Sequence, residues 1–177
     1  MSANAVFMSS VLEGYKLFGI VALISGLISV IAGLYSDNWA IVITGIALLV
    51  IGALVYTEKV KGKVNIVKFY LIIYGAAFFI AGTQLDGLMM WFHIVTGILA
   101  VFIGLSMYFG ERRGEIWWII LLVVFLILTI IGLMDLSDID FGTIKGIVAS
   151  IGIIFSLILN IYMLFFLFSK EVKSKFK

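Results

Sequence analysis

The sequence predicts an all-α integral membrane protein whose six transmembrane helices form three consecutive helical hairpins. The first observation is composition: 64% of the 177 residues are hydrophobic and 12% are charged, against about 45–50% and about 25% in soluble domains. The second is a series of six long apolar blocks, and the third is the confinement of basic residues to alternate connections between them. A soluble fold of this length could not bury so much apolar surface, whereas a bilayer can.

Each apolar block is about long enough to cross a hydrocarbon core of about 30 Å as a helix. The blocks are continuously apolar, without the in–out alternation of lipid-facing strands, so helices are favoured over a β-barrel. No basic cluster precedes the first block, which is also longer than a signal-peptide core, and we interpret it as a retained helix. The blocks cover about residues 16–35, 39–56, 64–82, 88–109, 116–134 and 146–168.

The basic residues predict that both termini are cytoplasmic. One set of connections and the tail carry nearly all of them, whereas Lys145 alone lies in the other set. Cytoplasmic loops of membrane proteins carry this excess of Lys and Arg. The predicted location is therefore the cell (cytoplasmic) membrane, crossed several times. The cytoplasmic set contains Lys16, Lys59, Lys61, Lys63, Lys68, Arg112, Arg113, Lys170, Lys173, Lys175 and Lys177.

An internal repeat of about fifty residues divides this single transmembrane domain, residues 1–177, into hairpins at about 15–58, 64–111 and 116–169. The return helices share an aliphatic-x-Gly-Ile start at Gly45, Gly97 and, more loosely, Gly146. Because each unit contains two spans, the three repeats would be parallel and not inverted. Each hairpin turn contains aspartate, and we expect Asp37, Asp86 and Asp140 to cap the return helices.

Glycines recur at a spacing of seven residues, which places each set on one face of its helix. Small residues on one face let helix backbones approach closely, and in lipid such packing drives association. The fifth block is bulky instead, so we expect a peripheral helix with Trp117 and Trp118 as an interfacial anchor. The predicted packing glycines are Gly19, Gly26, Gly33, Gly45, Gly52, Gly75, Gly82, Gly97 and Gly104.

Four weakly polar residues are the candidates for a polar path or for hydrogen bonds between helices: His93, Thr96, Ser156 and Asn160. Intramembrane ionisable residues usually mark function, but no Asp, Glu, Lys or Arg lies in the middle of any block. His93 is therefore without an evident proton-relay partner, and a hydrogen bond to a neighbouring helix or to interfacial water is the simpler role. For Asn160, structural packing is favoured over lining a path.

Catalytic and metal-binding signatures are missing from the sequence. It has no cysteine, which excludes disulfides and thiolate metal sites. It contains no zinc spacing, P-loop, dinucleotide fingerprint or nucleophile motif. We therefore expect no enzyme activity, no cofactor and no metal. The formal charge of +2 is too small to indicate nucleic-acid binding.

The repeated pattern resembles the HdeD-like family of small six-helix membrane proteins. It consists of a glycine-spaced helix, a short turn and an aliphatic-Gly-Ile start to the return helix, and it extends from about Gly19 to Asn160. The chain departs from that family by having no proline in its turns. The resemblance implies a bacterial or archaeal cytoplasmic-membrane protein, with acid-stress resistance attached to the best-known member, and it carries no catalytic residues.

Three functions stay open from the sequence. The first is a non-enzymatic scaffold or accessory subunit, with the bilayer and other membrane subunits or further copies of the chain as partners. The second is a small channel or transporter that works through the four weakly polar residues. The third is a lipid-binding or membrane-shaping protein that uses the basic inner face.

Overall fold

The computed structural model describes residues 3–109, 114–137 and 142–176, and every element in these ranges is helical. This confirms the all-α prediction. The first helix begins well before the apolar block predicted to form it, and two short helices follow the sixth. The elements are α1 (Ala3–Tyr35), α2 (Trp39–Tyr56), α3 (Lys63–Gly82), α4 (Gly87–Tyr108), α5 (Glu115–Ser137), α6 (Ile144–Phe168), α7 (Lys170–Lys173) and the 3-10 helix η1 (Ser174–Phe176).

Five of the described helices are long and apolar enough to cross a membrane. In α5 the described apolar stretch, Glu115–Ile130, is shorter, so six spans in three parallel repeats stay a prediction. A mostly apolar helix of about 20 residues matches the thickness of the hydrocarbon core. The five apolar segments are Gly14–Tyr35, Trp39–Tyr56, Lys63–Gly82, Gly87–Tyr108 and Gly146–Phe168.

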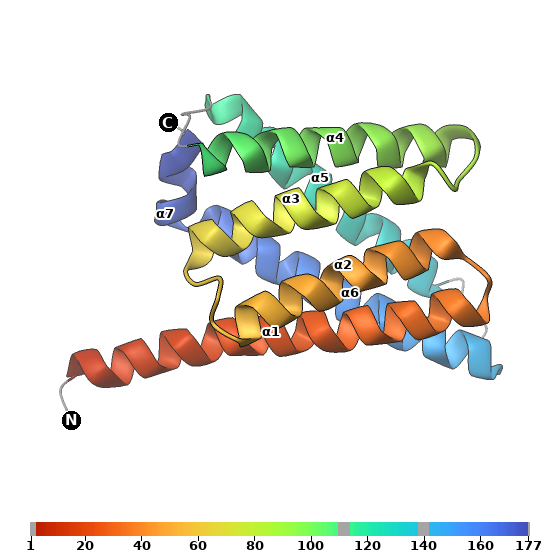
Figure 1. The fold of residues 1–177 in the computed structure, drawn as a ribbon, viewed down its shortest axis with the longest axis horizontal. Coiled ribbons are helices and arrows are strands. Elements are labelled where there is room, and N and C mark those ends of the chain that lie inside the picture. Colours follow the sequence, from red (N-terminus) through yellow and green to blue (C-terminus); the bar gives the residue numbers. More distant parts are fainter. Residues whose placement is uncertain (1–2, 110–113, 138–141, 177) are drawn as a thin grey trace.

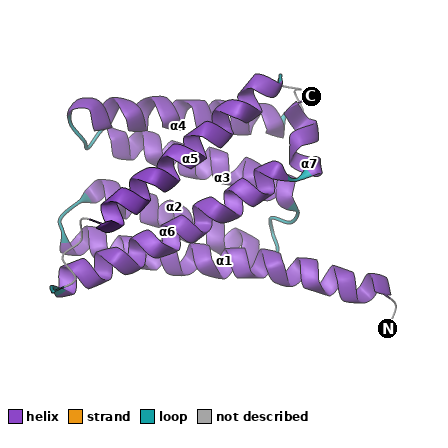
Figure 2. Cartoon of the chain, turned by 180° about the vertical axis from the view of Figure 1, so that it is seen from behind, coloured by secondary structure: helices purple, strands orange, loops and turns teal. Residues whose placement is uncertain are grey.

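The long helices form two layers. Helices α1, α2, α3 and α4 lie side by side in chain order, and α5 and α6 cross behind them (Figure 1). Seen from behind, α6 runs over α1 and α2, while α5 crosses obliquely over α3 and α4 (Figure 2). Two hairpins therefore form one layer, and the third hairpin covers one face of it. The hydrophobic core lies between the layers and includes Phe18, Ile66, Leu121 and Met163.

Glycines hold α1 and α2 at backbone contact. A Cβ built on Gly26 would lie 2.7 Å from the carbonyl oxygen of Gly45, and one on Gly52 would lie 2.9 Å from that of Gly19. Gly33 faces Val42 at the end of the same contact nearest the α1–α2 turn, where a Cβ would lie 2.8 Å from the Val42 nitrogen. Any side chain at these positions would have to separate the two helices.

The contact between α3 and α4 is built in the same way. Cβ atoms built on Gly75 and Gly82 would meet side chains of α4 at 2.8 and 2.9 Å. One built on Gly97 would lie 2.7 Å from the carbonyl oxygen of Gly75, and one on Gly104 would lie 2.8 Å from Ile72. In the third hairpin, Gly152 faces Ile28 of α1 instead of α5. Close glycine contacts therefore fasten the first two hairpins internally, whereas this glycine of α6 fastens the third hairpin to the first.

Helix α5 buries Leu121 and Phe125 against the other layer. Its opposite face exposes Ile116, Val123 and Ile130, so it lies at the periphery. Helix α4 is also largely uncovered, because the residues that it buries begin only at its middle: Gly97, Ile103, Gly104, Ser106 and Met107.

The aspartate capping prediction is wrong at Asp37 and holds at Asp86 only for the position of the residue. At α2 the N-cap is Asn38, whose side chain accepts from the Ile41 N–H, and Asp37 adopts a left-handed conformation with φ 54°. Asp and Asn tolerate that conformation in tight turns. Asp86 occupies the N-cap of α4 without a side-chain cap hydrogen bond. Asp140 lies outside the described residues, and Thr143 caps α6.

The C-terminal segment folds back across one end of the bundle. Val172 of α7 and Phe176 of η1 are both fully buried. The Trp118 Nε1–H donates to the Leu167 carbonyl oxygen at 2.9 Å, and Lys173 Nζ lies 4.3 Å from the Trp118 ring centroid. Trp118 therefore anchors this segment through tertiary contacts in addition to any role at an interface.

Candidate functional site

The structure does not bring the four predicted polar residues into one path. His93 and Thr96 lie on α4, whereas Ser156 and Asn160 lie on α6. Only Thr96 lines the cavity between α3, α4 and α5. The polar groups are therefore divided between two regions of the bundle.

His93 is held against α3. Its Nδ1 lies 2.9 Å from the Met89 carbonyl oxygen, one turn earlier in the same helix. Its ring stacks on Phe78, with 4.0 Å between ring centroids. A neutral imidazole that donates from Nδ1 presents Nε2 as an acceptor. His93 is thus mainly a packing residue whose free nitrogen can accept one further hydrogen bond.

Ser156 and Asn160 lie on α6 between two residues that contact α1: Gly152, which faces Ile28, and Tyr162, whose ring contacts Phe18. Asn160 is 8% exposed, and within the described part of the chain it makes no side-chain hydrogen bond. On α1, Ser25 is fully buried, and its Oγ has no hydrogen-bond partner among the described residues. An unpaired buried hydroxyl costs about 1–3 kcal/mol. This region is polar but contains none of the described cavities.

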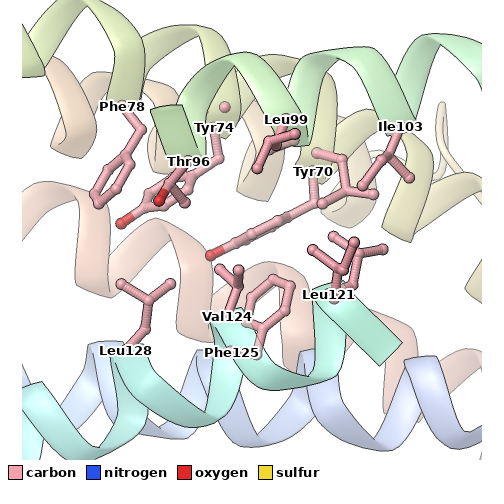
Figure 3. A pocket seen from close by; sticks show the side chains of 14 residues that line it. Tyr70, Tyr74, Phe78, Thr96, Leu99, Ile103, Leu121, Val124, Phe125 and Leu128 are labelled. Carbon is pink, nitrogen blue, oxygen red and sulfur yellow. The ribbon is translucent and has the colours of Figure 1, made fainter. Parts of the chain in front are cut away.

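A cavity of about 30 Å³ lies between α3, α4 and α5 (Figure 3). Its wall is apolar apart from the hydroxyl groups of Tyr70, Tyr74 and Thr96. The three hydroxyl oxygens lie toward the Phe78 side of the cavity, and the Tyr70 ring reaches toward the middle of the labelled side chains (Figure 3). Sequence reasoning singled out Thr96 and missed both tyrosines. The spacing of four residues from Tyr70 to Tyr74 to Phe78, which places them on one helix face, was the available signal.

Stacked aromatic rings extend from this cavity toward the C-terminal end of α3. Ring centroids are 5.0 Å apart between Tyr70 and Tyr74 and 5.7 Å apart between Tyr74 and Phe78, with near-parallel planes in both pairs. Phe78 then stacks on His93. Such pairs add about 0.5–1.5 kcal/mol beyond burial. The stack therefore fixes the directions of the two tyrosine hydroxyls.

An open groove adjoins the cavity at Thr96. It has a volume of about 500 Å³ and lies between the first half of α4 and Ile127 of α5. Thr96 lines both the groove and the cavity, so this residue lies between the two spaces. The groove is lined by Leu88, Met89, Trp91, Phe92, Val95, Thr96 and Ile127.

Neither space is lined by an Asp, Glu, Lys, Arg or His side chain. In the described residues, no group of three or more His, Cys, Asp or Glu could hold a metal ion. Charged substrates are therefore poorly matched to this site, since a buried charge needs a partner. The arrangement suits apolar molecules with at most a few hydrogen-bonding atoms.

Comparison of the chain with protein-family models, curated proteins and solved structures gives no match. The resemblance to the HdeD-like family therefore stays a prediction.

Proposed function

We propose that this chain is a non-enzymatic integral membrane protein that acts as a scaffold or accessory subunit of a larger membrane assembly. In this proposal six helices cross the cytoplasmic membrane, and both termini are cytoplasmic. The partners are the bilayer and other membrane subunits or further copies of the chain. The fold supplies a rigid frame, and association takes place on its apolar outer faces.

The observation that carries this proposal is the closure of the first two hairpins by glycine. Across both contacts the built Cβ atoms would lie within 3.0 Å of the partner helix, which leaves no room for water between the helices. Packing of this kind stabilises helix pairs in lipid without any solute path. A scaffold needs such rigidity, whereas a channel needs a continuous polar passage.

A channel or transporter has less support. The candidate residues Asn160 and Ser156 lie away from the cavity that contains Thr96, and His93 is stacked on Phe78. A surface-binding role for the basic face is also weakened. Lys16 and Lys61 pair with Glu58, and Lys173 pairs with Glu115.

The test is the mass and composition of the particle extracted from its native membrane in mild detergent. Stoichiometric foreign subunits, or a defined homo-oligomer with no transport activity, are the expected results. The purified protein should then be reconstituted in liposomes and assayed for solute flux. If the wild-type protein gives flux, and Asn160→Leu or His93→Leu abolishes it, the protein is a transporter and the scaffold proposal is wrong.

A further inference from the structure

The hydroxyl of Tyr70 has no hydrogen-bond partner although the residue is almost completely buried. Tyr70 is 3% exposed, and its hydroxyl is directed into the cavity between α3, α4 and α5 (Figure 3). Among the described residues, no hydrogen bond reaches it or the hydroxyls of Tyr74 and Thr96. Buried Tyr hydroxyls usually find a partner. Three unpaired hydroxyls on one side of one cavity indicate a place for a hydrogen-bonding atom of a ligand.

The groove between α4 and α5 lies beside the cavity, with Thr96 lining both. Leu88 and Met89, which line the groove, are exposed, so a route into the cavity from the side of the bundle would pass the Thr96 side chain. Helices α4 and α5 are close at the end where residues 114–115 begin α5 and diverge toward the other end (Figure 2). In a bilayer this opening would face lipid. An apolar molecule could therefore enter without passing through water.

The dimensions and lining of the site restrict its ligand. A cavity must offer about 10–15 Å³ to hold one water molecule, so about 30 Å³ accepts a terminal oxygen with its carbon but not a ring. The groove of about 500 Å³ has room for a hydrocarbon chain. Because no charged side chain lines either space, the ligand should be neutral. Thr96 lies nine residues after the start of α4, about 13 Å along the helix, which is too deep for a phospholipid headgroup.

We propose that the groove and the cavity together bind a neutral, single-chain lipophile with a terminal oxygen, such as a fatty alcohol or a fatty aldehyde. The chain lies in the groove against Trp91 and Val95. The oxygen lies in the cavity and accepts hydrogen bonds from the Tyr70 and Tyr74 hydroxyls, which use its two lone pairs. Thr96 lines the cavity beside them. This site goes beyond the scaffold role and is compatible with it.

A photoreactive long-chain alcohol tests the site in the full-length protein in detergent and in liposomes. The probe carries a diazirine in its chain, and cross-linked residues are mapped by mass spectrometry. We expect cross-links concentrated between Leu88 and Thr96 and at Ile127. Octadecanol and octadecanal should each compete with the probe in separate experiments. The more potent of the two shows whether the site prefers an alcohol or an aldehyde oxygen. Octadecane should not compete, because it lacks the hydrogen-bonding atom.

Variants separate the hydroxyl interaction from the fold. Tyr70→Phe and Tyr74→Phe each remove one hydroxyl, and each should weaken octadecanol competition about five- to tenfold, the effect of one hydrogen bond. Tyr162→Phe removes a hydroxyl on α6 outside the cavity and should leave competition unchanged. Val124→Phe fills the cavity from α5 and should abolish it. Val123→Phe, at an exposed neighbouring position, is its matched control.

Equal competition by octadecane and octadecanol would overturn the proposal. So would cross-links spread evenly over the lipid-facing residues of α1 and α2, which is the pattern of lipid that merely surrounds the protein. Unchanged competition in Tyr70→Phe and Tyr74→Phe would also overturn it, because both variants keep the ring and the packing while losing the hydroxyl.

Discussion

Gly97 shows how a single residue sets the distance between two helices. A Cβ built there would lie 2.6 Å from the Phe79 nitrogen and 2.7 Å from the Gly75 carbonyl oxygen. Both are backbone atoms of α3 and cannot rotate away as a flexible side chain can. The close approach of α3 and α4 therefore requires a residue without a side chain at this position. The same approach shapes one wall of the cavity between α3, α4 and α5.

We predict that Gly97→Ala destabilises the protein by about 1–3 kcal/mol, the usual cost of overpacking. The new methyl group must push α4 away from α3, and this cost exceeds the helix-propensity gain of about 1 kcal/mol from Gly to Ala. Unfolding in mixed micelles with increasing sodium dodecyl sulfate, followed by circular dichroism, measures the change.

Gly14→Ala is the matched control, since a Cβ at Gly14 meets nothing within 4 Å. It should be neutral or stabilising by up to about 1 kcal/mol. If Gly97→Ala were as stable as Gly14→Ala, the close contact would not be needed for folding.

Glu58 links the connection between α2 and α3 to α1. Its carboxylate lies 2.7 Å from Lys61 Nζ and 3.0 Å from Lys16 Nζ. Hydrogen bonds from Lys61 and then Lys16 lower the pKa of Glu58 from 4.5 to about 2. Because the folded-state pKa is depressed, the stability that this contact contributes is fully present above about pH 4.5 and is lost as the pH falls from there through about 2.

We predict that Glu58 stays ionised at pH 3 in the folded protein, as measured by a carbon-13 carboxyl titration in micelles. Replacing both lysines, as Lys16→Met with Lys61→Met, should return its pKa toward 4.5 because the two donors are gone. A wild-type midpoint near 4.5 would show that the ion pairs do not persist in solution.

At the scale of elements, the C-terminal segment acts as a cover for one end of the bundle. Val172 and Phe176 contribute its buried side chains. The Ser169 hydroxyl caps α7 by accepting from the Val172 N–H. The turn at Ser169 thereby directs α7 back toward α3. From the sequence, the four lysines of this tail indicate only that it is cytoplasmic. Val172 and Phe176 lie between these lysines and give the segment a buried face.

We predict that Phe176→Ala releases the tail without unfolding the membrane-embedded helices. Removing a buried Phe costs about 3–5 kcal/mol, and a short terminal segment can undock locally to avoid most of it. Trypsin should then cleave at Lys170, Lys173 and Lys175 faster than in the wild type. Phe165→Ala, at a position that is 68% exposed, should leave cleavage unchanged. Equal cleavage of both variants would mean that Phe176 does not hold the tail.

The sequence predicts helices much better than it predicts their starts and caps. The continuous apolar blocks place α2, α3 and α4 within about a residue or two of their observed bounds. It cannot place the start of α1 at Ala3, because residues before the apolar block can continue a helix for reasons other than burial. It also assigns capping to Asp37, while the chain uses Asn38. The choice between adjacent residues depends on turn geometry, which spacing alone does not encode.

At the scale of the whole molecule, the order of the hairpins in space is beyond sequence patterns. Glycine spacing identifies which face of a helix approaches a partner, but not whether three hairpins form a ring or a layer. Here Gly152 contacts Ile28 and so joins the third hairpin to α1. The resulting layer of four helices, crossed by α5, is what creates the cavity. Tyr70 and Tyr74 acquire a common environment only through that crossing, which explains why sequence reasoning missed them.

The arrangement of the ends leads to a prediction about orientation. Both termini and the α2–α3 connection lie at one end of the bundle, and the α1–α2 and α3–α4 turns lie at the other (Figure 1). Most of the basic residues belong to the first end, so it should face the cytoplasm. Since the chain has no cysteine, single cysteines can report each end without background.

We predict that Gln84→Cys reacts with a membrane-impermeant maleimide in intact cells, and that Ser174→Cys reacts only after the membrane is opened. Both side chains are exposed, so access depends on the side of the membrane and not on burial. The reversed pattern would place the termini outside. Labelling of both cysteines in intact cells would contradict the arrangement of the ends itself, because residues at opposite ends of a membrane-spanning bundle cannot share one face of the membrane.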